Sequence, residues 1–132
     1  MPRTVAAAIL GLVMGANGLA MLLAGHWWYG AVPGVTGTGS YNPHFVMDIG
    51  AAYLAVAAAL VWRAARPSTM ALGACVIATA FLGLHAGIHL VDQAFGGGGL
   101  GDLTRDFAGV FLPPAVALWI VWPALSRDED RP

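Results

Sequence analysis

Four long apolar segments dominate the pattern of hydrophobic and polar positions along this chain. They cover residues 4–25, 44–62, 69–92 and 105–125, and none shows the polar and apolar faces that are typical of a helix on a soluble protein. Each has about 20 residues, the length that crosses a ~30 Å hydrocarbon core as an α-helix. The pattern predicts an all-α fold, an antiparallel bundle of four transmembrane helices that forms one integral membrane domain over residues 1–132.

The segments between these spans carry helix-ending and helix-starting signals. Asn42 precedes a proline and can cap the second span, and Ser68 or Thr69 can cap the third. Thr104 or Asp102 can cap the fourth span, which follows the glycine run 96–99, a flexible loop by composition. Pro113 and its neighbouring proline lie within the fourth span, where missing N–H groups predict a bend.

Arginine positions predict the orientation. Five of the six arginines lie before the first span, between the second and third, or after the fourth: Arg3, Arg63, Arg66, Arg127 and Arg131. Basic residues near span ends stay in the cytoplasm, so both termini are expected inside and the loops 26–43 and 93–104 outside. The expected location is a bacterial inner (cell) membrane. A cleaved signal peptide is the alternative for the first segment, although that segment is long and follows a single basic residue.

Composition supports a membrane protein. The chain is 58% hydrophobic and 10% charged, with a mean hydropathy of +0.72, whereas soluble domains are roughly 45–50% apolar and about 25% charged. The net charge of −1 gives no indication of a nucleic-acid partner. The single cysteine, Cys75, is expected to be a packing residue. Small residues at helix-packing spacing, Ala7, Gly11 and Gly15 in the first span and Gly83 and Gly87 in the third, predict close approach of helices.

Ionisable residues interrupt the apolar pattern near the outer ends of the spans. The stretch LHAGIHLVD at residues 84–92 places His85, His89 and Asp92 at about 0°, 40° and −20° around a helix, on one face. His44 and Asp48 are four residues apart near the start of the second span. Because such residues inside a membrane are costly unless they face the bundle and pair, we expect the two faces to meet beneath the outer surface.

The first hypothesis for this cluster is a metal site. His44, His85 and His89 would supply three nitrogens and Asp48 one carboxylate, a set that suits zinc, copper or non-haem iron. Helix bundles hold such sites between facing helices. Three further residues are expected to surround the site or contact a cofactor: His26, Asp92 and Asp106.

Three other hypotheses stay open. Haem b could be held by His44 or His26 together with His85 or His89, for electron transfer. The histidines and carboxylates could exchange protons, or handle a quinone, near neutral pH. The polar cluster could instead serve helix packing, a homo-oligomer, or docking to a larger complex, with the chain a non-catalytic accessory subunit. Whether the protein is an enzyme is left open.

The stretch YNPHFVMDIGAAYLA, a polar outer loop that leads to an acidic residue and small residues, is similar to part of the small four-helix membrane proteins grouped around the DoxX family. The likeness covers the whole chain in hydropathy. It implies a four-helix membrane fold and an association with membrane redox or quinone-linked complexes. It assigns no catalytic residue in this sequence.

Overall fold

The computed structural model describes residues 1–96 and 98–128, with side chains as far as Trp122, and these residues form helices and connecting loops without any strand. The elements are α1 (Pro2–Leu23), α2 (Gly25–Ala31), the short 3₁₀ helix η1 (Val35–Thr38), α3 (Pro43–Ala65), α4 (Thr69–Phe95), α5 (Leu100–Asp106), the π-helical segment η2 (Phe107–Phe111) and α6 (Leu112–Asp128). Four stretches are long and apolar enough to cross a membrane, namely α1, α3, α4 and residues 100–122. The predicted all-α fold with four spans is confirmed.

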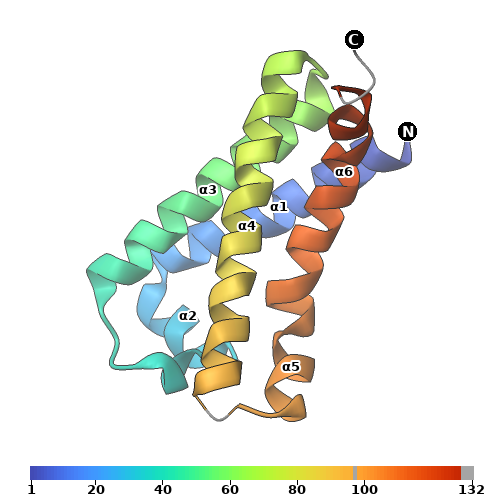
Figure 1. Cartoon of the computed structure of the whole chain (residues 1–132). Coiled ribbons are helices and arrows are strands. Elements are labelled where there is room, and N and C mark those ends of the chain that lie inside the picture. The colour runs from blue at the N-terminus through green and yellow to red at the C-terminus, as the bar shows by residue number, and fades with distance from the viewer. Residues whose placement is uncertain (97, 129–132) are drawn as a thin grey trace.

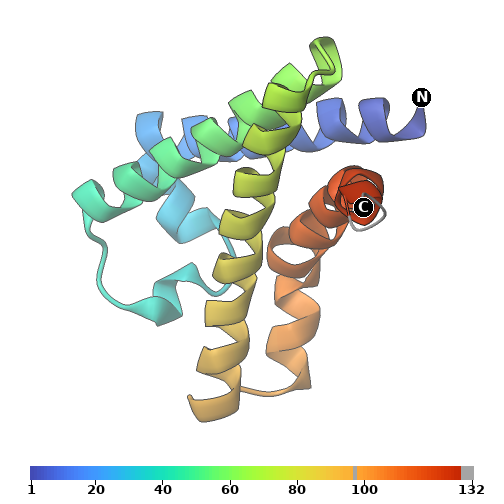
Figure 2. The same ribbon diagram turned by 45° about the horizontal axis from the view of Figure 1, so that its top comes forward.

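The four long helices form a closed ring of contacts (Figures 1 and 2). α1 packs along α3, α3 contacts α4, α4 contacts α6, and α6 returns to α1. The guanidinium of Arg3 lies 5.3 Å above the ring of Trp119, so the start of α1 and the last turns of α6 are together. We call this end, which also holds the turn at residues 66–68, the terminal end, and the opposite end, with α2 and α5, the loop end.

α1 and α3 approach closely because glycines line their contact. A Cβ atom on Gly18 would lie 2.7 Å from the carbonyl oxygen of Gly50, and one on Gly11 would lie 2.9 Å from a methyl group of Val61. The expected close packing of the first span is therefore confirmed. Gly83 and Gly87 differ, because a Cβ atom on either would meet nothing within 4 Å among the described residues, so these two make no close helix contact in that part of the chain.

The predicted caps are present. The Asn42 side-chain oxygen accepts a hydrogen bond from the Phe45 N–H at 3.2 Å, and the Ser68 hydroxyl accepts one from the Ala71 N–H at 3.1 Å. At the start of α5 the Asp102 carboxylate accepts the Gly99 N–H at 3.0 Å. Each bond satisfies an amide that the first turn of a helix would otherwise leave without a partner.

The paired prolines bring a change of helix type. Neither Pro113 nor Pro114 can donate to the carbonyl four residues earlier, and the turn directly before them widens into η2, where the Leu112 N–H donates to the Phe107 carbonyl. At this point the chain changes direction, so that the axis of α6 is inclined to that of α5 (Figures 1 and 2). The predicted bend is therefore found, and the chain makes it through a π-helical turn.

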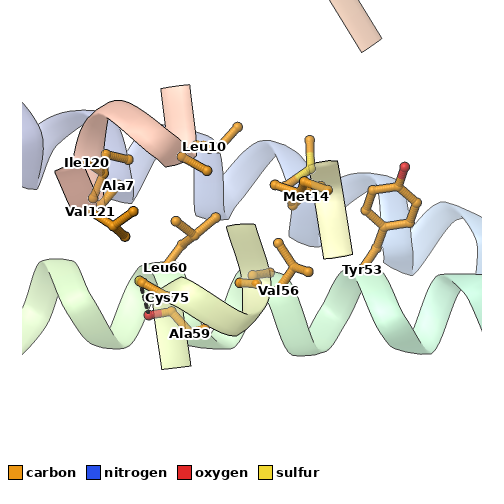
Figure 3. Packing of buried hydrophobic residues seen from close by; sticks show 14 of the residues in the cluster. Ala7, Leu10, Met14, Tyr53, Val56, Ala59, Leu60, Cys75, Ile120 and Val121 are labelled. Atoms are coloured by element: carbon orange, nitrogen blue, oxygen red, sulfur yellow. Dashed lines mark hydrogen bonds between the residues drawn. The ribbon is translucent and has the colours of Figure 1, made fainter. Parts of the chain in front are cut away.

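The core lies where α1, α3, α4 and α6 meet (Figure 3), and it is made of alanines and branched side chains such as Leu60 and Val121, both almost fully buried. Cys75 is 0% exposed within this core, and its thiol donates to the Ala59 carbonyl at 3.4 Å. The prediction that Cys75 is a packing residue is confirmed.

Candidate functional site

Two histidines on successive turns of α4 form the centre of the candidate site. The rings of His85 and His89 are 5.0 Å apart in an edge-on arrangement. His85 also lies parallel to Phe81, with ring centres 6.3 Å apart, and meets the buried Tyr53 of α3 edge-on at 6.0 Å. Both imidazoles are partly buried. His85 thus lies among aromatic rings, whereas His89 lies closer to the loop end.

His89 is bonded to a carboxylate from another helix. Its Nδ1 lies 3.0 Å from Oδ2 of Asp106, which is 7% exposed and is the one buried charged side chain among the described residues. Arg105 clamps that carboxylate, with Nε donating to Oδ1 at 2.7 Å and Nη2 to Oδ2 at 3.2 Å. The same guanidinium donates through Nη1 to Asp102 at 2.7 Å.

The local sequence explains how Asp106 reaches α4. Asp106 is the last residue of α5, and η2, which contacts α4, begins at the next position. A π-helical turn holds one residue more than an α-helical turn does, and therefore re-aims the side chains beside it. Asp106 is consequently buried against α4, whereas the following Phe107 is 58% exposed.

The contact with Asp106 selects one tautomer of the His89 ring. A carboxylate only accepts hydrogen bonds, so Nδ1 of His89 carries the proton and donates to Asp106. In the neutral ring the lone pair is then on Nε2, and no described residue donates to it. Asp106 also stabilises the ring when Nε2 becomes protonated. Chemically, His89 is therefore a proton acceptor that a carboxylate orients.

His44 and Asp48 form a separate pair on α3. Nε2 of His44 lies 3.5 Å from Oδ2 of Asp48, and the two side chains are 88% and 61% exposed. α3 and α4 diverge from the turn at residues 66–68 toward the loop end (Figures 1 and 2), so the pair lies on one arm of a V and the α4 histidines on the other.

Within the described part of the chain, no three His, Cys, Asp or Glu side chains are grouped to hold a metal ion. The structure does not bring the four predicted ligands together.

The three predicted surrounding residues have different positions. His26, in α2, is exposed and meets the ring of Tyr41 edge-on at 5.1 Å. The side chain of Asp92 is exposed on the last turns of α4. Asp106 is at the centre of the site, not at its edge, because it bonds His89 directly.

The sequence interpretation missed Arg105 and Tyr53 as site residues. Arg105 stands out in the sequence only as the basic residue on the outer side, although its spacing from Asp102 is that of a helical ion pair. Tyr53 is the single aromatic residue in an alanine-rich stretch of α3, which is the sequence signal that distinguishes it.

The loop before α3 completes the site's surroundings. Gly34 has a φ of +87°, and a Cβ atom there would lie 2.7 Å from the guanidinium carbon of Arg105. α2 is held to α1 by a hydrogen bond from Trp28 Nε1 to Asn17 Oδ1 at 2.8 Å. Elements from both halves of the chain therefore meet at Arg105.

Comparisons with known proteins identify no relative of the chain: no family model, curated protein or solved structure matches it. The resemblance to the DoxX-like proteins stays a prediction.

Proposed function

We propose that this chain is a small integral membrane protein whose histidine pair accepts and returns protons for a phenol-type hydroxyl compound that enters from the lipid. One observation carries the proposal: His89 donates to a buried carboxylate that Arg105 clamps, which leaves Nε2 as a proton acceptor. The loop end then faces the exterior, since Arg3, Arg63 and Arg66 are at the terminal end.

Among the four hypotheses from the sequence, the geometry favours proton handling. Both oxygens of Asp106 already accept hydrogen bonds from Arg105, which suits this carboxylate to orienting His89 and makes it a poor metal ligand. Haem b would need His44 or His26 on the same haem as His85 or His89. His44 instead lies exposed beside Asp48 on α3, and His26 lies exposed beside Tyr41.

The proposed step is a single proton transfer. The O–H bond of the hydroxyl breaks, an N–H bond forms at Nε2 of His89, and the electron pair stays on the substrate oxygen. Asp106 stabilises the resulting imidazolium. The pKa of a phenolic hydroxyl, about 10 as in tyrosine, is far closer to the pKa of a protonated imidazole than the pKa of an aliphatic alcohol is. This makes phenols and hydroquinones the suitable substrate class, in line with a role beside membrane redox chemistry.

Histidine NMR tests the proposal. The ¹⁵N-labelled protein in lipid nanodiscs is titrated with methylhydroquinone, which has no long tail. We expect saturable shifts of the His89 and His85 ring signals, with the shifts lost in His89→Gln and weakened in Asp106→Asn. His26→Gln is the control, because His26 is exposed and its ring meets Tyr41 rather than the α4 histidines, and it should leave the shifts intact. Absence of saturable shifts in the wild type, or their persistence in His89→Gln, would refute the proposed site.

A further inference from the structure

An apolar groove between α3 and α4 ends at Phe81, the residue whose ring is stacked on His85. The groove has a volume of about 330 Å³ and is lined by small and apolar side chains from both helices: Ala52, Ala55, Val56, Ala59, Ala74, Ile77, Ala78 and Phe81. Phe81 forms its limit toward the loop end on α4, and the ring of Phe81 is stacked on His85. The apolar groove and the polar site therefore share a boundary residue.

The helical register places the α4 wall of the groove and His85 on one face of the helix. At ~100° per residue, Ala74, Ala78, Phe81 and His85 fall within an arc of roughly 60° on α4. On α3, Asp48 lies within roughly 40° of Ala52 and Ala55, so the exposed carboxylate continues the other wall. The end of a bound molecule that is nearer to the loop end would lie between ionisable side chains.

We propose that this groove holds the hydrocarbon tail of the substrate, which is therefore a lipid with a phenol or hydroquinone head. The inference rests on the proposed function, because the head is the group that meets His85 and His89. The tail lies along the alanines of α3 and α4, and the head lies past Phe81, where the helices diverge.

The dimensions favour a lipid tail over a second copy of the chain. A helix with its side chains is ~10–12 Å wide, whereas a groove of about 330 Å³ is at the small end of ligand pockets. Five of its eight lining residues are alanines, which leave room for a narrow chain. Packing of a second helix in the groove would also not account for the ionisable side chains at the end of the groove that faces the loop end.

Photolabelling tests this assignment. The full-length protein in nanodiscs is irradiated with an alkyl hydroquinone that carries a diazirine at the end of its tail, and labelled residues are mapped by mass spectrometry. We expect labels between residues 55 and 59 and between residues 74 and 78. Ala78→Leu, which fills the groove, should reduce this labelling at least fivefold. Ala80→Leu is the control, because Ala80 is exposed on another face of α4.

The outcomes separate the two proposals. Labels spread evenly over the lipid-facing surface, or products linking two copies of the chain through the groove, would overturn the tail site. An equally long diazirine alkane without a hydroxyl group tests the link to the histidines, and equal labelling by it would overturn the assignment of a head group at that end. If Ala78→Leu abolishes labelling while methylhydroquinone still shifts His89, the tail site and the proton site are both supported. If the groove is labelled but His89 does not respond to methylhydroquinone, the proposed function fails on its own.

Discussion

Nδ1 of His89 lies 3.0 Å from Oδ2 of Asp106, across 17 positions of the chain and the glycine-rich loop between α4 and α5. The contact joins two helices at a point where the intervening loop, by composition, gives little restraint. It therefore has a mechanical role in addition to its chemical one: it fixes the start of the fourth span against the end of the third.

Replacement of Asp106 by asparagine should destabilise the protein and change the His89 tautomer. The variant keeps the shape of the side chain but loses a charge that accepts from His89 and Arg105. Hydrogen bonds to charged groups contribute about 1.5–3 kcal/mol, so we expect the free energy of unfolding in detergent to fall by about 1–3 kcal/mol. ¹⁵N NMR should show Nδ1 of His89 losing its fixed proton.

The control for that variant is Asp48→Asn. Asp48 also pairs with a histidine, but both side chains are largely exposed, and exposed changes are usually within about 0.5 kcal/mol. Equal losses in the two variants would mean that burial of Asp106 has no energetic consequence.

Gly18→Ala should weaken the packing of α1 on α3. The new methyl group would lie 2.7 Å from a backbone oxygen of Gly50, an atom that cannot rotate away. Overpacking typically costs about 1–3 kcal/mol, and we expect a loss of this size in thermal unfolding followed by circular dichroism. Gly87→Ala is the matched control, since its Cβ atom would meet open space, and alanine is about 1 kcal/mol more favourable than glycine in a helix. A stability loss at Gly87 as large as that at Gly18 would contradict a close approach of α1 and α3 at Gly18.

The sequence predicts the spans and caps of this fold because both depend on local properties. Span length follows from hydropathy, and the Asn42 and Ser68 caps follow from side chains that bond amides three residues away. The rotation of each helix about its axis does not follow from local sequence. α3 is apolar nearly all round, so its sequence does not show which face meets a neighbour. The cost of placing a charge against lipid favours an inward position for Asp48, yet Asp48 lies on an exposed face.

The site itself depends on two features that periodicity does not reveal. The divergence of α3 and α4 separates the His44–Asp48 pair from the α4 histidines, and a helix-crossing angle is set by packing across the whole bundle. The π-helical turn before Pro113 re-aims Asp106 toward His89. The sequence supplied the chemical groups, including His89 and Asp106, while tertiary structure decided which of them meet.

Trp28→Phe should loosen α2 from α1. Phenylalanine keeps an aromatic ring but removes the Nε1 donor that bonds Asn17 at 2.8 Å. A typical hydrogen bond contributes about 0.5–1.5 kcal/mol, so hydrogen exchange of the backbone amides in residues 25–42 should become several-fold faster, with little change in α4. Trp27→Phe is the control, as Trp27 is 67% exposed. The same acceleration in both variants would show that the bond to Asn17 does not hold α2 in place.

Gly34→Ala should displace the loop before α3 from Arg105, for two separable reasons. The residue has a φ of +87°, and a left-handed conformation costs a residue with a Cβ atom roughly 1–2 kcal/mol. Its Cβ atom would also lie 2.7 Å from the Arg105 guanidinium carbon. Hydrogen exchange over residues 32–42 should therefore accelerate, and Gly37→Ala, where a Cβ atom meets nothing within 4 Å, should have little effect.

A double-mutant cycle separates the two causes. Arg105→Gln shortens the side chain, so the steric part of the Gly34→Ala penalty should disappear in the double variant while the backbone part remains. A smaller penalty in the Arg105→Gln background would confirm that the loop rests on the guanidinium. An identical penalty would mean that backbone strain alone accounts for the effect and that the loop and the Asp106 clamp are energetically independent.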